Sequence, residues 1–141
     1  MRYLIVNIRL KDIAKLVVWI SFVKFVFLES INSYCLTKKG VEATFPFDEN
    51  TIVWKVMGKM FCLGDTENFT HITVKCNPED SLKLQESYEQ ITPGYHMNKK
   101  LWISVELEGL DSEFVFSLID TSYRLVVQKL PKKEQTLLET L

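Results

Sequence analysis

The sequence predicts an α+β domain, a two-layer sandwich in which helices cover one face of an antiparallel sheet. Short segments rich in β-branched residues follow one another in the middle of the chain, with tight turns between them, which favours antiparallel pairing. Longer segments with apolar residues at helical spacing stand before, between and after these strands. The expected order is helix, three strands, helix, one or two strands, helix.

The first half of this order begins with a helix over Glu29–Lys39, which Gly40 ends. A connection containing Phe45-Pro46-Phe47-Asp48 follows. Three strands are then expected, the first two forming a hairpin around Gly58: Thr51–Met57, Lys59–Gly64 and His71–Cys76.

The second half begins at Asn77-Pro78-Glu79-Asp80, which is typical of a helix start. The asparagine can cap, the proline fits the first turn and the acids suit the helix dipole. This helix should end before Pro93, and Leu101–Leu107 is predicted to be a strand. A long amphipathic helix is predicted over Asp111–Leu130, and Pro131 stops it.

The first 27 residues differ from the rest of the chain in charge, with a net of +4 against −5 for the remaining 114 residues. Leu16–Leu28 is an apolar run of 13 residues interrupted by Lys24, shorter than the ~20 residues a membrane span needs. One interpretation is a basic amphipathic helix on a membrane surface. We favour the other, an extension foreign to the domain that results from a start site placed too far upstream. The expected divisions are therefore an extension (1–27), one domain (28–133) and a frayed tail (134–141).

The three cysteines, Cys35, Cys62 and Cys76, are an odd number without C-x-x-C spacing, which argues against a disulfide framework and a zinc site. We expect reduced, mostly buried thiols in a cytoplasmic protein. The sequence shows neither a nucleophile–base pair nor a phosphate-binding glycine loop. We therefore predict no catalytic residue, no metal ligand and no cofactor, and a protein that is not an enzyme.

Strand alternation divides the sheet into two predicted faces. One is almost wholly apolar and should lie under the helices: Ile52, Trp54, Val56, Met60, Cys62, Ile72, Val74 and Cys76. The other mixes lysines with aromatic residues: Val53, Lys55, Lys59, Phe61, Leu63, His71, Thr73 and Lys75, joined by Trp102, Ser104 and Glu106 if the last strand is in phase. Such a face suits either a platform for nucleic acid or an ordinary solvated surface.

The segment Pro93–Trp102 combines a turn, two aromatic residues, a histidine, an amide and two adjacent lysines. As a structural turn, it would use Gly94 for its backbone freedom and leave the lysines in water. As a binding segment, it would place its polar side chains on a phosphate or carboxylate group: His96, Asn98, Lys99 and Lys100.

These motifs together resemble the MmcQ/YjbR family. The resemblance covers about Leu28 to Lys133 and is carried by Phe45–Asp48, Val53–Phe61, Lys75-Cys76, Pro93–Trp102 and the last helix with Leu118–Asp120, Ser122-Tyr123 and Leu130–Lys132. It implies a compact α+β fold related in shape to secretion chaperones and to the frataxin-like group. It also implies DNA binding, an assignment based on strand-loop wings likened to a double-winged element.

The resemblance and the lysine-bearing face together lead us to expect a DNA-binding protein. Its predicted contact residues are Lys55, Lys59, Lys75, Tyr95, His96, Asn98, Lys99, Lys100 and Trp102. Two alternatives stay open: a chaperone-like module that binds a protein or peptide on Val53, Phe61 and Leu63, and a binder of small anions or drugs at the His96–Lys100 corner. We expect a monomer or weak dimer, and no membrane association of the core domain.

Overall fold

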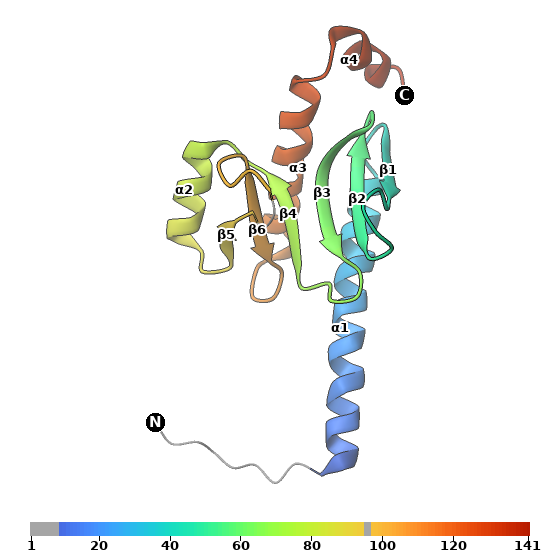
Figure 1. Ribbon diagram of the computed structural model, residues 1–141, viewed down its shortest axis with the longest axis vertical. Helices are drawn as coiled ribbons and strands as arrows, with labels where there is room; N and C mark the ends of the chain where they lie inside the picture. The colour runs from blue at the N-terminus through green and yellow to red at the C-terminus, as the bar shows by residue number, and fades with distance from the viewer. Residues whose placement is uncertain (1–8, 95–96) are drawn as a thin grey trace.

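A computed structural model describes residues 9–94 and 97–141, and its centre is one six-stranded antiparallel sheet in the order β1-β2-β3-β4-β6-β5 (Figure 1). Neighbouring strands pair antiparallel throughout. The strands are β1 (Val41–Thr44), β2 (Thr51–Val56), β3 (Lys59–Asp65), β4 (His71–Lys75), β5 (Ile91–Pro93) and β6 (Trp102–Glu106). The predicted α+β class is therefore confirmed.

Four helices complete the described residues: α1 (Leu10–Leu36), α2 (Pro78–Ser87), α3 (Ser112–Gln128) and α4 (Lys132–Glu139). The C-terminal part of α1 and the whole of α3 cover one face of the sheet, while α2 packs beside the edge strand β5 (Figure 1). Tyr34 ties the two covering helices together, because it stacks on Phe116 and donates a 2.7 Å hydrogen bond to Asp120.

The core fills the space between this helical layer and the sheet. Trp54 is fully buried there, and its indole N–H donates to the side chain of Asn32 on α1 at 3.0 Å. Ile119 and Val126 contribute from the apolar face of α3. Their spacing of seven residues, two helical turns, is the periodicity that predicts this helix from the sequence.

Several elements differ from the sequence-based prediction. The helix expected to begin at Glu29 begins at Leu10, so α1 runs through the expected division at residue 28 without a break. β1 forms in the segment predicted as a connection, and β5 forms where the second helix was predicted to reach Pro93, since edge strands of three or four residues carry almost no alternation signal. Residues 132–139 form α4 rather than a frayed tail, because Leu138 is buried against the body of the domain.

The face assignment of β3 is wrong in its first half because of a β-bulge. The register pairs Trp54 with Cys62 but Lys55 with Met60, so Phe61 is an extra residue opposite β2. Phe61 turns toward the helices, where it is fully buried and meets Tyr123 edge to face at 5.5 Å. Met60 consequently shares the open face with Lys55, and Lys59 shares the helical side with Val56.

Within the described residues, none of the helices combines the length and the apolarity that crossing a bilayer requires.

Candidate functional site

The five predicted lysines gather at one end of the sheet, although they come from four separate segments. Lys55 and Lys59 flank the β2–β3 turn, and Lys75 ends β4 directly opposite Trp102, the first residue of β6. Lys99 and Lys100 lie in the connection that enters β6 at this same end. We call this set the basic end: Lys55, Lys59, Lys75, Lys99 and Lys100.

The β2–β3 turn is a tight two-residue hairpin. Met57 and Gly58 have φ of 49° and 80°, the pair of positive values that matches the twist of the flanking strands. Glycine adopts this conformation without strain. Because the turn is short, Lys55 and Lys59 are held close to each other, on opposite faces of the hairpin tip.

Residues 97–101, directly before β6, form a hydrogen-bonded turn. The Asn98 side-chain oxygen accepts from the backbone N–H of Lys100 at 3.0 Å, and the Asn98 carbonyl accepts from Leu101 and Trp102. The backbone N–H of Gly94 donates to the carbonyl of Trp102 at 2.9 Å. Asn98 therefore shapes the loop, so its amide oxygen is not free to read a base, whereas Lys99 and Lys100 stay exposed. The predicted contacts Tyr95 and His96 lie outside the described residues.

Trp102 is buried against the domain rather than exposed on the open face. Only 7% of the residue is exposed, so its ring is not an open platform for stacking a base, contrary to the sequence-based prediction. The Lys75 ammonium lies 5.9 Å from the centre of this ring. Partial burial, together with repulsion by Lys129, lowers the pKa of Lys75.

Ser122, which belongs to a family motif in the last helix but was not predicted as a site residue, holds β3 and β4 together at the basic end. Its buried hydroxyl donates to the carbonyl of Phe61 and accepts a 2.8 Å hydrogen bond from the backbone N–H of Lys75. The β3–β4 pairing ends at Cys62 and Val74, so these two backbone groups lie just beyond it, and α3 supplies their hydrogen bonds through one side chain. The signal in the sequence was a serine on the apolar face of an amphipathic helix, between Ile119 and Val126.

The lysines of the basic end have no carboxylate partner within the described residues. Ion pairs there form at Lys38–Asp120 and Lys83–Glu79, and neither includes a lysine of the basic end. Two acids lie near these lysines without forming an ion pair: Glu42 stands opposite Lys55 in the β1–β2 register, and Asp80 lines a small pocket together with Lys75.

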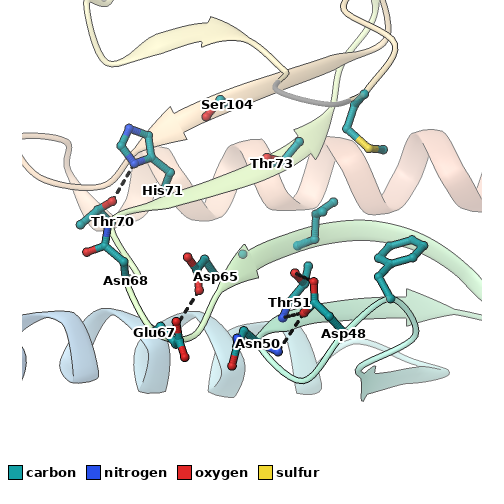
Figure 2. A pocket seen from close by; sticks show the side chains of 14 residues that line it. Asp48, Asn50, Thr51, Asp65, Glu67, Asn68, Thr70, His71, Thr73 and Ser104 are labelled. Carbon is teal, nitrogen blue, oxygen red and sulfur yellow. Dashed lines mark hydrogen bonds between the residues drawn. The ribbon is translucent and has the colours of Figure 1, made fainter.

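The opposite end of the sheet is acidic, and a broad groove of about 830 Å³ lies on the open face beside it (Figure 2). Leu63, Thr73 and Ser104 line it from the strands, and Phe47 and Met97 reach it from loops. His71 borders the groove and shares a 2.7 Å hydrogen bond with Thr70. We call the acids of this region the acidic end: Asp48, Asp65, Glu67, Glu106 and Glu108.

The two alternative surfaces expected from the sequence differ from the surfaces found. Val53 and Phe61 are completely buried, which leaves Leu63 as the partly exposed member of the expected apolar docking surface. Asn98, Lys99 and Lys100 do not line the large groove. The groove therefore presents carboxylates rather than the cationic corner that a small anion requires.

The three cysteines are buried, unpaired thiols. Burial raises the pKa of Cys62 and of Cys76, so both are neutral thiols at neutral pH rather than reactive thiolates. Among residues 9–94 and 97–141, no three side chains of His, Cys, Asp or Glu are grouped to hold a metal ion.

The fold and these motifs define a class of small bacterial α+β domains. The family model for YjbR matches residues 36–125. The chain is also 41% identical to the uncharacterised protein YbdF of Escherichia coli O157:H7 over 109 residues, which cover 76% of this chain and 89% of YbdF. This chain therefore belongs to the YjbR family.

Further comparisons agree with this assignment. The chain is 29% identical to the uncharacterised protein YjbR of Escherichia coli K12 over 113 residues, 79% of this chain and 96% of that protein. A crystal structure of the Deinococcus radiodurans protein DR2400, with its domain DUF419, superposes with a TM-score of 0.74 at 34% identity, covering 79% of this chain and 87% of that one. A Pseudomonas syringae protein superposes with a TM-score of 0.52 at 27% identity, covering 60% and 86%.

Proposed function

We propose that this protein binds DNA through the basic end of its sheet. The observation that carries the proposal is the convergence of five lysines on two loops and one strand end, without carboxylate partners among the described residues. The β2–β3 hairpin and the connection before β6 project at this end on either side of β4, as two basic wings would. The proposal places the protein in the cytoplasm and includes no catalytic step.

The spacing of the lysines suits a phosphate backbone. Neighbouring strands lie about 4.8 Å apart, so β2 and β6, three intervals apart, are separated by roughly 14 Å. Phosphates of one strand advance about 3.4 Å each along a duplex, so a length of about 14 Å exposes several of them. Lysines contact such oxygens as point charges without reading sequence, which predicts binding with little base specificity.

The acidic end limits where DNA can lie. Its carboxylates repel phosphates from the groove on the open face and confine the contact to the basic end. Since the whole chain carries a net charge of −1, the affinity should be modest and strongly dependent on salt. Five phosphate contacts predict a log–log salt slope of about −4.5 for duplex DNA and about −3.5 for a single strand.

The test is fluorescence anisotropy with labelled single- and double-stranded DNA at several salt concentrations. Lys99→Glu/Lys100→Glu should weaken binding by at least about tenfold at low salt. The control Lys15→Glu/Arg124→Glu makes the same change in net charge on exposed residues of α1 and α3 and should retain most of the affinity. Equal losses in both variants, or no binding of the unmodified chain at low salt, would refute the proposal.

The groove on the open face supports a second candidate, the binding of a basic peptide or protein segment. Its wall combines the carboxylates of Asp48, Asp65 and Glu67 with the apolar side chains of Phe47 and Met97. A lysine-rich peptide should bind the unmodified chain, and Asp65→Lys/Glu67→Lys should abolish that binding while leaving DNA affinity the same or higher. Loss of peptide binding in Lys99→Glu/Lys100→Glu instead would exclude the groove.

A further inference from the structure

The N-terminal half of α1 leaves the domain (Figure 1). Its large apolar side chains are exposed to solvent. Trp19 is 61% exposed, Phe25 57% and Phe22 55%. The other exposed apolar side chains of this segment are Leu10, Ile13, Leu16, Val17, Val18, Ile20 and Val26. An apolar patch of this size on a soluble surface marks an interaction site.

The apolar residues surround the helix rather than forming a stripe. Val17, Val18, Trp19 and Ile20 are consecutive and all exposed, and four consecutive residues face every side of an α-helix. A helix lying flat on a lipid surface needs a polar face toward water, and this segment has none between Leu16 and Ile20. Among the described residues, no helix is suited to cross a bilayer. A protein partner therefore fits this segment better than a membrane.

Charge identifies the partner. The far end of α1 carries Arg9, Lys11 and Lys15 against one acid, Asp12. Where the helix meets the domain, Trp19, Val23 and Phe27, together with one basic residue, Lys24, form one wall of a groove of about 370 Å³, and the acidic residues Glu106 and Glu108 contribute to the other. The chain thus carries both a basic, apolar helix and an acidic groove with an apolar wall.

We propose that two copies of this chain pair through antiparallel α1 helices, each lying in the other's groove. Residues 10–27 extend about 27 Å at 1.5 Å per residue. An antiparallel pair of such segments brings the partner's Lys11 and Lys15 beside Glu106 and Glu108. Because the two copies are related by a two-fold axis, each of these contacts occurs twice in the dimer, and the dimer is closed.

Sedimentation equilibrium of the full chain tests the pairing. The unmodified chain should be dimeric at micromolar concentration. Val18→Asp/Phe22→Asp should weaken association by at least about a hundredfold, because two apolar contacts per helix are lost and charges are introduced. The control Leu82→Asp, at a side chain 64% exposed on α2, should leave the dimer intact. An unmodified chain that is monomeric at 100-fold higher concentration, or equal weakening by the control, would overturn the proposal.

A charge swap tests the antiparallel arrangement. Lys11→Glu/Lys15→Glu should weaken the dimer, and adding Glu106→Lys/Glu108→Lys should restore it, with circular dichroism confirming that each variant is folded. Glu108→Lys alone, at an exposed turn residue, should restore part of the affinity if the full swap unfolds. Failure of a folded swap to restore pairing would overturn the arrangement. If the chain is monomeric and co-sediments with phosphatidylserine–phosphatidylcholine vesicles, the proposal is overturned, and the partner of α1 is a lipid surface rather than a second copy.

Discussion

The two ends of the sheet carry opposite charges and hold them in different ways. At the acidic end, the Asp48 carboxylate accepts hydrogen bonds from the backbone N–H of Thr51 at 2.6 Å and of Asn50 at 2.8 Å, and from the Thr51 hydroxyl at 3.1 Å. These bonds lower the pKa of Asp48. At the basic end, by contrast, partial burial and Lys129 lower the pKa of Lys75, so its environment disfavours the charge.

This difference separates charges that build the domain from charges that are available to a ligand. Asp48 stabilises the loop before β2 by its own hydrogen bonds, and Asp65 accepts from the backbone of Glu67 in the next loop. The lysines of the basic end form no ion pair within the described part of the chain. A bound phosphate would relieve the repulsion around Lys75, whereas a cation at Asp48 would compete with hydrogen bonds already formed.

The largest effect is expected where the basic end is joined to the helices. Ser122→Ala should lower the free energy of unfolding by about 1–3 kcal/mol, because it leaves the buried carbonyl of Phe61 and the N–H of Lys75 without hydrogen-bond partners. Urea titration measures this loss. Ser117→Ala, which removes an exposed hydroxyl bonded to its own helix, should cost less than about 0.5 kcal/mol.

The same variant distinguishes the two ends by hydrogen exchange. Protection should fall at residues 59–62 and 74–76, beside the lost bridge, and persist at the acidic end, where Thr51–Asp65 and His71–Glu106 pairs remain. A uniform loss of protection would mean that the two ends of the sheet unfold together rather than opening locally.

A smaller effect is expected on the salt dependence of DNA binding. Lys59→Ala should reduce the magnitude of the log–log slope by about 1, as the loss of one phosphate contact does. Asp65→Asn removes one charge at the other end and should leave the slope unchanged. Anisotropy titrations between low and moderate salt give both slopes, and equal slopes for the two variants would contradict a localised interface.

The charge of Asp48 should contribute to stability in a defined pH range. Because its pKa is lowered in the folded state, the contribution is present above the ordinary pKa of Asp and is lost as the pH falls through the folded value. Asp48→Asn should therefore be less stable than the unmodified chain at pH 7, and the gap should narrow below about pH 4. Thermal unfolding of both chains across this pH range measures the difference in stability.

The smallest change in stability is expected at Lys75. Lys75→Met keeps the side-chain length beside Trp102 and removes a charge that its surroundings disfavour, so stability should stay the same or rise within about 0.5 kcal/mol. DNA affinity should nevertheless fall, with a slope smaller by about 1. A clear loss of stability would show that the Lys75 charge belongs to the fold rather than to the ligand.

Much of the fold follows from local pattern. The hairpin at Gly58, the helix start at Asn77 and the apolar face of α3 are all read from neighbouring residues. The register confirms that Trp102, Ser104 and Glu106 share a face with Lys75, Thr73 and His71, as the alternation predicts. The resemblance to the YjbR family is likewise carried by short motifs and is confirmed by the comparisons.

The site was predicted less completely, for reasons that depend on distant contacts. Residue type identifies Lys99 and Lys100 as exposed charges, but it cannot show that Asn98 is engaged by its own loop or that Trp102 is covered. The bridging role of Ser122 was not predicted because its two partners, Phe61 and Lys75, lie 61 and 47 residues away in the sequence.

The main strands and helices and the charged positions follow from spacing and residue chemistry along the chain, so they could be predicted without the fold. Which charges meet, and which side of the sheet they face, depends on contacts between segments far apart in the sequence. One bulged residue, Phe61, reverses the alternation of β3 before it, and Phe61 is held there by Tyr123 and Ser122 of α3. Antiparallel pairing then separates basic from acidic residues that alternate along the chain, because strand ends distant in sequence meet at the same end of the sheet.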